Sequence, residues 1–429
     1  MMESRKEGKK MKFALNHLWK EKTPFILYGL TTVFSLSVCQ LFLGILDHPY
    51  FQLISENPDL PYISYIMGSL TSLIVTGMCC FLLVYTSQYF LVSKSKELGL
   101  MRSLGMTLKQ LTYYFIYQNT FIFIVFGTIG ICLSYSLYPL LLMIIKVFDS
   151  QLVVQTLSLS SIVENIGLFA FIYVVVIVFH IGYIYRSRLQ GLLSLQNRRN
   201  HVFHLNKYMY PVIYFIGFVM MALSEHNGAG YIFYACLCTL ASQGIMKQLI
   251  PEEIERVYQK QKFNQSQQMI IFGHLRKRLK DMSLFIAMIL LISTVFIAMI
   301  SFNLSYNKEM LRSLLAYFIV YALIILSMTY KNYLFINEHI QSLFYLGKMG
   351  MTKTQMKKAV FYELFIFYAL LMILPFVYIT FILIKCYIYQ QIQLYLIMIL
   401  IIYFISLLVL SFAVIYLLSL KKVREEKWK

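Results

Sequence analysis

Long apolar stretches alternate with short polar, mostly basic segments along the whole chain. A helix that crosses ~30 Å of hydrocarbon needs roughly 20 predominantly apolar residues. The stretches that meet or approach this length lie at residues 24–46, 64–92, 112–145, 165–185, 209–224, 230–248, 282–302, 313–330, 360–385 and 394–420. The pattern predicts an all-α integral membrane protein with about ten transmembrane helices.

The fifth and sixth stretches give the weakest signals. The fifth is short, and only the polar turn Glu225–Gly228 separates it from the sixth. Two spanning helices or one re-entrant hairpin both fit this pattern. Both alternatives return the chain to the same side of the membrane, so the rest of the topology is the same in either case.

Composition supports the membrane assignment and gives it a direction. Hydrophobic residues make up 59% of the chain and charged residues 13%, whereas soluble domains carry about 25% charge. Nearly all Lys and Arg residues lie in the segments on one side of the predicted spans, and only four lie elsewhere: Lys146, Lys308, Arg312 and Lys385. Because cytoplasmic loops collect Lys and Arg, both termini are expected in the cytoplasm. The formal net charge of +19 therefore indicates topology and attraction to anionic lipid, not nucleic-acid binding.

The sequence offers no catalytic or metal-binding pattern. No P-loop, His-Glu-x-x-His or Gly-x-Ser-x-Gly motif is present, so we expect no enzyme activity and no cofactor. All the cysteines fall inside or at the edge of predicted spans, without the spacing of a disulfide framework or a zinc site: Cys39, Cys79, Cys80, Cys132, Cys236, Cys238 and Cys386. Energy for any transport must therefore come from another protein.

A short internal repeat is the most informative feature. The hexamer Gly105–Gln110 (Gly-Met-Thr-Leu-Lys-Gln) recurs as Gly350–Gln355 (Gly-Met-Thr-Lys-Thr-Gln), each time on the predicted cytoplasmic side between two spans. In both copies a polar residue follows the glycine at the same distance, Gln118 in the first and Glu363 in the second. These two are candidate intramembrane polar residues, although Glu363 lies near the cytoplasmic boundary, where pairing with Lys357 or Lys358 favours a structural role.

A fainter echo precedes each set of four spans. His17-Leu18-Trp19-Lys20 resembles His274-Leu275-Arg276-Lys277, each in a basic, partly apolar stretch suited to an interfacial helix. We therefore expect a 4+2+4 arrangement. Its parts are a first half at residues 1–190, a connector with the fifth and sixth spans at 191–265, and a second half at 266–429.

The segment before Gly105 has the character of a docking helix. Glu97, Leu98, Met101, Arg102 and Leu104 recur at helical spacing, so an apolar stripe flanked by charges is able to enter a groove on a partner. Gly105 would let the chain turn directly into the next span, so that helix and span move together. A solvated membrane-edge loop is the alternative, and the second copy of the hexamer weighs against it.

At these residues the chain resembles the FtsX-like permeases of ABC transporters. The resemblance lies in Lys94–Thr107 and Gln110, where a basic residue leads into Glu97-Leu98-Gly99 and then Arg102-x-Leu104-Gly105-Met106. In that family this pattern forms the cytoplasmic helix that meets the ATPase. A degraded copy at residues 338–363 keeps Gly350, Met351 and Thr352. The resemblance implies a soluble ABC ATPase in two copies as partner.

The 4+2+4 order further resembles the ten-helix, Bce-type branch of these permeases, which is associated with antimicrobial-peptide resistance. That branch has a large extracellular domain between its seventh and eighth spans, and here only about ten residues, 301–312, lie there. By this resemblance the protein belongs in a bacterial cytoplasmic membrane, with membrane lipid and a sensor histidine kinase as further partners. Short outer loops favour a cargo met in the bilayer, such as an antimicrobial peptide or a lipid.

Two other functions remain open at this point. An FtsX-like mechanotransmitter would use the ATPase without moving a substrate. A secondary transporter is disfavoured because the two halves run parallel instead of inverted and charge in the middle of the spans is sparse. His180, alone on an apolar helix, is expected to hydrogen-bond between helices instead of holding a ligand.

Overall fold

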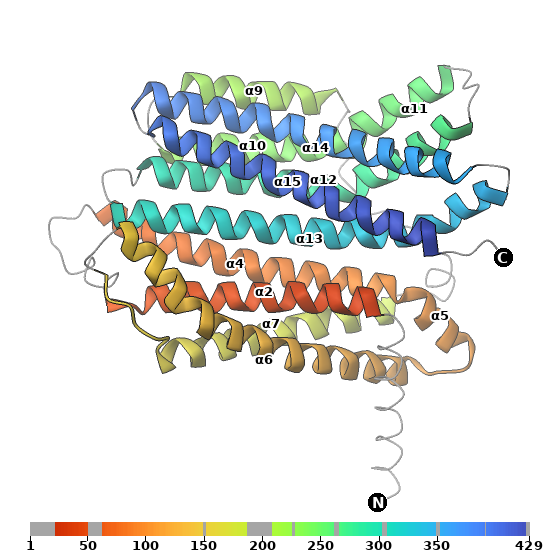
Figure 1. The fold of residues 1–429 in the computed structure, drawn as a ribbon, viewed down its shortest axis with the longest axis horizontal. Coiled ribbons are helices and arrows are strands. Elements are labelled where there is room, and N and C mark those ends of the chain that lie inside the picture. The colour runs from red at the N-terminus through yellow and green to blue at the C-terminus, as the bar shows by residue number, and fades with distance from the viewer. Residues whose placement is uncertain are drawn as a thin grey trace, which may run out of the picture. The chain divides into compact units, whose positions relative to one another are not determined.

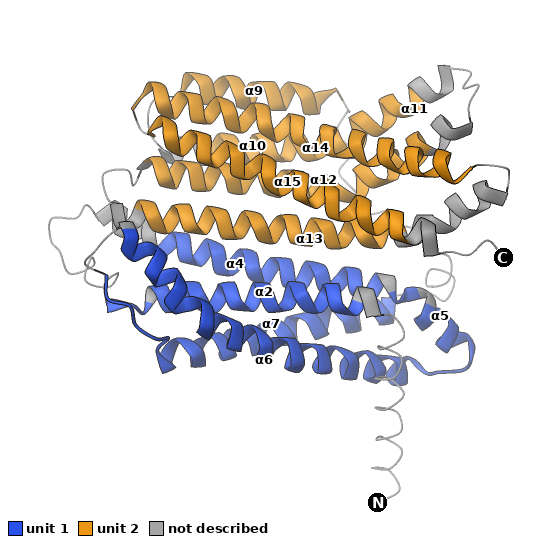
Figure 2. Cartoon of the chain, in the orientation of Figure 1, with its two compact units in different colours: residues 1–201 blue, residues 202–429 orange. Residues whose placement is uncertain are grey.

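The computed structural model describes residues 22–49, 62–148, 152–186, 208–224, 228–260, 266–302, 307–348, 352–390 and 392–425. Every regular element in these ranges is a helix (Figure 1). The chain forms two compact units, residues 1–201 and residues 202–429, called unit 1 and unit 2 below (Figure 2). The prediction of an all-α membrane protein is confirmed.

Unit 1 is a bundle built around its first helix. Its helices are α2 (Lys22–Leu46), α4 (Tyr62–Ser93), α5 (Ser95–Ser103), α6 (Leu108–Phe148) and α7 (Leu159–Arg186). The long helices α4, α6 and α7 all contact α2. Consequently α2 is the most buried of the four long helices in this unit.

Small residues bring α2 and α6 close together. A Cβ on Gly130 would lie 3.1 Å from the carbonyl oxygen of Val33, so the two backbones meet at this point. The Ser37 hydroxyl donates to the Val33 carbonyl at 2.8 Å and to the Gly130 carbonyl at 2.9 Å. Close approach through small and hydroxyl residues is typical of helix association within membranes.

Unit 2 contains the remaining helices. They are α9 (Met209–Leu223), α10 (Gly228–Gly244), the π-helical turn η2 (Ile245–Leu249), α11 (Ile250–Lys260), α12 (Ser266–Phe302), α13 (Asn307–Lys348), α14 (Lys353–Ile388) and α15 (Leu394–Glu425). Helix α12 is central because it contacts α10, α11, α13 and α14. Helices α10, η2 and α11 follow one another without a break, and Pro251 lies just after the π turn. A proline cannot donate to the preceding turn, and the wider π turn accommodates this.

Lys385 of α14 completes the end of α9. Its Nζ donates to the carbonyl of Met221, to that of Ala222 at 3.2 Å, and to the carbonyl and hydroxyl oxygens of Ser224 at 2.8 and 3.2 Å. The last carbonyls of a helix have no partner within the helix. The buried ammonium group of Lys385 satisfies them here. Lys385 is one of the four basic residues that lie away from the predicted cytoplasmic side, and this contact gives it a structural role.

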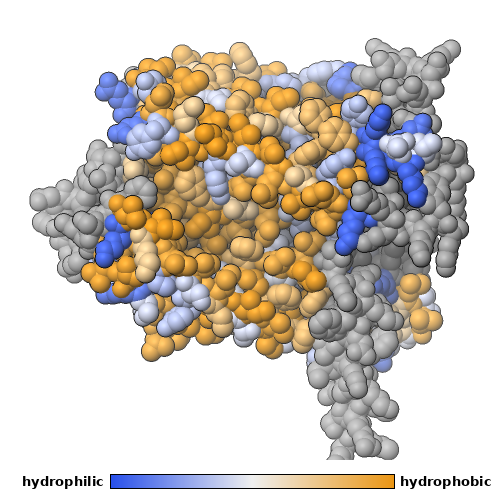
Figure 3. All heavy atoms as spheres, viewed as in Figure 1, coloured by the Kyte–Doolittle hydropathy of each residue, from blue (hydrophilic) through white to orange (hydrophobic). Residues whose placement is uncertain are grey.

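Eight of the described helices are long and apolar enough to cross a membrane, and they correspond to all the predicted spans except the fifth and sixth. The fifth corresponds to α9, whose 15 residues extend about 22 Å, and the sixth to α10, which continues through η2. On the face drawn in Figure 3, apolar side chains cover the middle parts of the helices and hydrophilic ones gather towards helix ends. This distribution suits a bilayer.

The expected interfacial helices have different outcomes. Residues 17–20 lie outside the described residues. Residues 274–277 belong to the continuous helix α12 and do not form a helix of their own. No glycine or proline occurs between His274 and Phe302, so nothing interrupts the helix where the charged stretch meets the apolar one.

Candidate functional site

The candidate docking helix α5 lies between two long helices of unit 1. Lys94 separates it from α4, and the Leu98 amide donates to the Lys94 carbonyl at 3.0 Å, which starts α5 as α4 ends. Leu98 is 1% exposed and Met101 8% exposed, and α5 contacts both α4 and α6. These two side chains therefore anchor α5 to its own unit.

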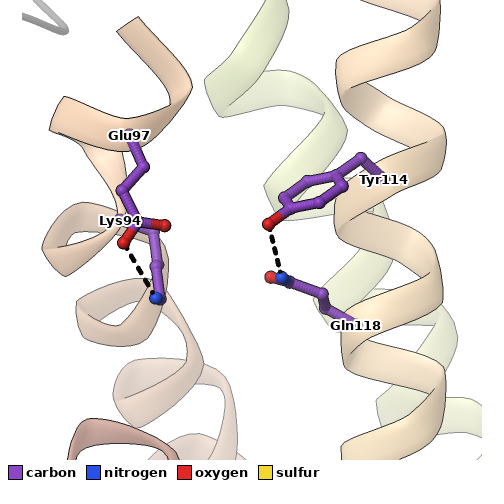
Figure 4. A network of polar contacts seen from close by, with 4 residues as sticks. All are labelled: Lys94, Glu97, Tyr114 and Gln118. Atoms are coloured by element: carbon purple, nitrogen blue, oxygen red, sulfur yellow. Dashed lines mark hydrogen bonds and ion pairs between the residues drawn. The ribbon is translucent and has the colours of Figure 1, made fainter. Parts of the chain in front are cut away.

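A buried lysine fixes the first turn of α5. The Lys94 Nζ lies 3.1 Å from Oε1 of Glu97, and the lysine side chain is 3% exposed. In Figure 4 this pair, on one side of the view, faces Tyr114 and Gln118 of α6 on the other. Opposite charges three residues apart stabilise a helix, and the acidic member also lies favourably in the first turn.

The apolar residues expected to dock are divided between a buried and an exposed face of α5. Leu98 and Met101 are buried, whereas Leu100 is 57% and Leu104 85% exposed. Leu100 and Leu104 are four residues apart and so share one face of the helix. The apolar surface open to a partner therefore consists of Leu100 and Leu104, whereas Arg102 is partly exposed on another side of α5.

Gly105 ends α5 in a way that determines the direction of the chain. Its φ of +91° is in the region that favours glycine. The Gly105 amide donates to the Arg102 carbonyl, and the Met106 amide donates to the Met101 carbonyl, both at 3.1 Å. This pair of bonds is a Schellman motif, so the turn from α5 towards α6 is tightly hydrogen-bonded.

The repeated hexamer contains a helix start in both copies. Thr107 and Gln110 exchange bonds at the start of α6: the Gln110 amide donates to the Thr107 hydroxyl at 3.4 Å, and the Thr107 amide donates to Gln110 Oε1 at 3.1 Å. Thr352 and Gln355 do the same at the start of α14, at 3.4 and 3.0 Å. Each is a capping box. Gly350 and Met351 lie outside the described residues.

Gln118 is buried in unit 1. Its Nε2 donates to the Tyr114 hydroxyl at 2.8 Å, and the side chain is 0% exposed. The next residue, Asn119, donates from Nδ2 to Nδ1 of His180 at 2.8 Å. The Nε2 of His180 lies 3.2 Å from the carbonyl of Ser87, which can only accept, so Nε2 carries the hydrogen. This chain of bonds joins α4, α6 and α7, as expected of a helix-packing histidine.

Glu363 is paired with residues of another helix of unit 2. Its Oε1 lies 2.9 Å from Nη2 of Arg278, and its Oε2 lies 3.5 Å from Nδ1 of His274. The expected pairing with Lys357 or Lys358 has unsuitable spacing, because five and six residues do not bring side chains together on a helix. The structure instead gives Glu363 partners on α12.

The Arg278 guanidinium is enclosed by aromatic rings. It lies 4.6 Å from the ring centre of Phe335 and 5.6 Å from that of Phe367. The side chains of Arg278 and Glu363 are 3% and 6% exposed. A buried ion pair therefore links α12 to α14, with α13 contributing one of the two rings.

Unit 2 also has a polar connection across three helices. The Tyr368 hydroxyl lies 2.6 Å from the Ser411 hydroxyl, and Asn332 Nδ2 donates to Tyr368 at 3.4 Å. This connects α13, α14 and α15. Each unit thus has a three-helix polar connection, whose central group is His180 on α7 in unit 1 and Tyr368 on α14 in unit 2.

Several of these residues were not predicted as site residues from the sequence. Lys94 was detectable from its spacing to Glu97, and Asn119 as a polar residue in an apolar span. Arg278 gave no local signal, because its partner is far away in the sequence. Among the described residues, no group of three or more His, Cys, Asp or Glu side chains is placed to hold a metal.

Comparison with known proteins identifies the first unit. Residues 78–189 match the family model described as FtsX-like permease C-terminal. No curated protein matches the chain. Members of this family are in general non-catalytic membrane components that work with an ABC ATPase. The matched segment runs from within α4 through α5 and α6 to just beyond α7, so the resemblance seen in the sequence is confirmed: this part of a multi-pass membrane protein is similar to FtsX-like permeases.

Proposed function

We propose that this protein is the membrane subunit of an ABC transporter, in which a separate ATPase drives export or removal of a membrane-associated substrate. The observation that carries the proposal is α5. Its inner face is anchored by Leu98 and Met101, its outer face presents Leu100 and Leu104, and the Gly105 turn leads directly into a long apolar helix.

The geometry suits transmission of a push. An ATPase groove that receives Leu100 and Leu104 would bury two apolar side chains, each worth about 1.5–3 kcal/mol when fully buried. Because the Schellman turn joins α5 to α6, a displacement of α5 passes to α6. We further propose that the protein has a Bce-type architecture, binds two ATPase copies and associates with a sensor histidine kinase.

The cargo is proposed to be amphipathic. An antimicrobial peptide or a lipid already concentrates in the bilayer, and both units have many exposed apolar side chains along their long helices. Resistance or immunity to such a peptide in a bacterial cytoplasmic membrane is the role we favour.

Docking is tested by a charge on the exposed face of α5. Leu104→Glu should reduce copurification of the ATPase about tenfold or more, since an ionised side chain cannot enter an apolar groove. Leu159→Glu is the matched control, because Leu159 is 81% exposed at the start of α7. Equal ATPase recovery with Leu104→Glu and Leu159→Glu would reject α5 as the docking helix.

Orientation requires its own experiment. A cysteine at Lys109, exposed at the start of α6, should react with an impermeant maleimide only after cells are opened. A cysteine at Leu159 should react in intact cells. The reverse pattern would place both termini outside.

Cargo movement is measured separately in proteoliposomes containing the ATPase, where ATP-dependent loss of a fluorescent amphipathic peptide distinguishes transport from force transmission alone.

A further inference from the structure

A ladder of polar side chains lies at the end of unit 1 opposite α5. Gln40 lies on α2, and Asp47, seven residues later, directly follows this helix. Ser158 directly precedes α7, and Ser161 and Asn165 follow on it at intervals of three and four. Both spacings place the residues on one face of a helix or at its start. The Gln40 amide nitrogen lies 3.4 Å from the Ser161 hydroxyl, so the two polar faces meet.

The exposed end of the ladder is anionic. Oδ2 of Asp47 accepts from the hydroxyls of Ser158 and Ser160, each at 3.1 Å. Within the described part of the chain, no basic side chain pairs with this carboxylate. Part of its role is structural, because a carboxylate beside the start of α7 stabilises that helix.

The inner end of the ladder cannot be explained in this way. Asn165 is 1% exposed and Gln40 is 0% exposed. Both amide atoms of Asn165 and the Oε1 of Gln40 make no hydrogen bond within the described residues. Buried polar groups are nearly always satisfied, and an unsatisfied one costs free energy. Three such atoms beside one polar contact indicate a site that a ligand completes.

One wall of this site is firmly held. Leu152 and Leu157 are buried, and His48 Nε2 lies 3.1 Å from the Val153 carbonyl. The Tyr138 hydroxyl donates to the Gly44 carbonyl at 2.9 Å. Segment 152–158 is thus attached to the end of α2, and the donors of His48 and Tyr138 are already used.

The unused groups define the ligand chemistry. They are mostly acceptors, namely Gln40 Oε1 and Asn165 Oδ1, with one donor at Asn165 Nδ2. The Asp47 carboxylate, which already accepts two hydroxyl bonds, adds a negative charge nearby. A primary ammonium group has three donors, no acceptor and a positive charge. Exposed apolar side chains on the neighbouring face of α7, Leu159, Val163 and Ile166, suit an attached hydrocarbon chain.

We propose that unit 1 binds the primary ammonium group of an amphipathic amine between α2 and α7, at Gln40 and Asn165, with Asp47 at the exposed end of the ladder attracting the positive charge. Identification of this amine as the transported cargo rests on the function proposed above. Binding itself does not, and it is measured without ATPase or nucleotide. A failure to bind therefore leaves the coupling role of α5 untouched.

The test uses the full chain in lipid nanodiscs and the fluorescent amine dansylcadaverine. Saturable binding is expected, and the neutral butylamide analogue should not compete. Asp47→Asn, Gln40→Leu and Asn165→Leu should each raise the Kd about tenfold or more, as expected for loss of a hydrogen bond to a charged group. Asn165→Asp, which keeps the size and adds a negative charge, should lower the Kd.

The matched control is Glu164→Gln. Glu164 is an exposed carboxylate next to Asn165 on the other face of α7, so this variant changes the charge by the same amount as Asp47→Asn but should bind normally. An equal loss in Glu164→Gln would show attraction to surface charge alone and overturn the proposal. Unchanged binding in a stabilised Asn165→Leu variant would identify the buried amide as a structural defect. Displacement of the probe by Na⁺ or Ca²⁺ with the same dependence on the variants would make this an inorganic-cation site, which also overturns the ammonium assignment.

Discussion

The Arg278–Glu363 ion pair allows a sharp prediction about stability. Its side chains are 3% and 6% exposed, so both charges are removed from water. Breaking such a pair by replacing one partner costs about 3–5 kcal/mol because the other charge remains buried. Glu363→Leu or Arg278→Met should each destabilise unit 2 by about this amount, whereas the double replacement should be close to neutral.

The measurement is thermal unfolding of the four proteins of this double-mutant cycle in one detergent. Arg276 of α12 and Glu255 of α11 provide a control pair, because their atoms are 2.6 Å apart but both side chains are 37% exposed. Solvent screening leaves such a pair worth about 0–1 kcal/mol. Additive losses in the Arg278–Glu363 cycle, or equal effects in the two cycles, would refute the claim that burial makes this pair strong.

Three further predictions concern local structure. Gly105→Ala should destabilise the turn after α5 by about 1–2 kcal/mol, and Gly105→Asn by less. A Cβ at this position meets no atom within 4 Å, so the whole cost comes from the positive φ. Amide exchange at residues 105 and 106 measures the loss, and equal protection in the wild type and both variants would contradict the prediction. Thr352→Ala should speed amide exchange at the start of α14, by loss of a cap worth about 1 kcal/mol, whereas Thr354→Ala should not. Burial lowers the pKa of His48 from its ordinary value, so the native state prefers the neutral ring. The docking of segment 152–158 should therefore weaken as the pH falls below about 6.5. A spin label at Val153 should become more mobile at pH 5.5, and persistence of this change in His48→Gln would exclude the histidine as its cause.

The sequence was a good guide to where helices exist. Length and apolar composition decide whether a segment can span a bilayer, and these are local properties. Helix ends were less accurate, because capping and uninterrupted helix formers extend helices beyond their apolar parts. Thus α6 begins at Leu108 directly after the Thr107 cap, before the apolar stretch predicted from residue 112.

The role of α5 in docking stays a prediction, but the structure shows which of its side chains are exposed. Leu98 and Met101 have helical spacing, and so do Leu100 and Leu104. Periodicity alone cannot decide which pair is buried, since that depends on where α4 and α6 lie. The partners of Glu363 required the fold for the same reason, because Arg278 and Phe335 approach it from other helices.

The cap that Lys385 gives to α9 has a consequence for biosynthesis. Helix α9 is made before α14, and the ammonium group that satisfies its last carbonyls comes from a residue 161–164 positions later in the chain. Until α14 has entered the membrane, this 15-residue helix has an incomplete end, and unsatisfied carbonyls are costly away from water. We therefore expect nascent α9 to stay at the membrane surface or in the translocation machinery until α14 is made, and a chain that stops before Lys385 to be recognised by membrane proteases.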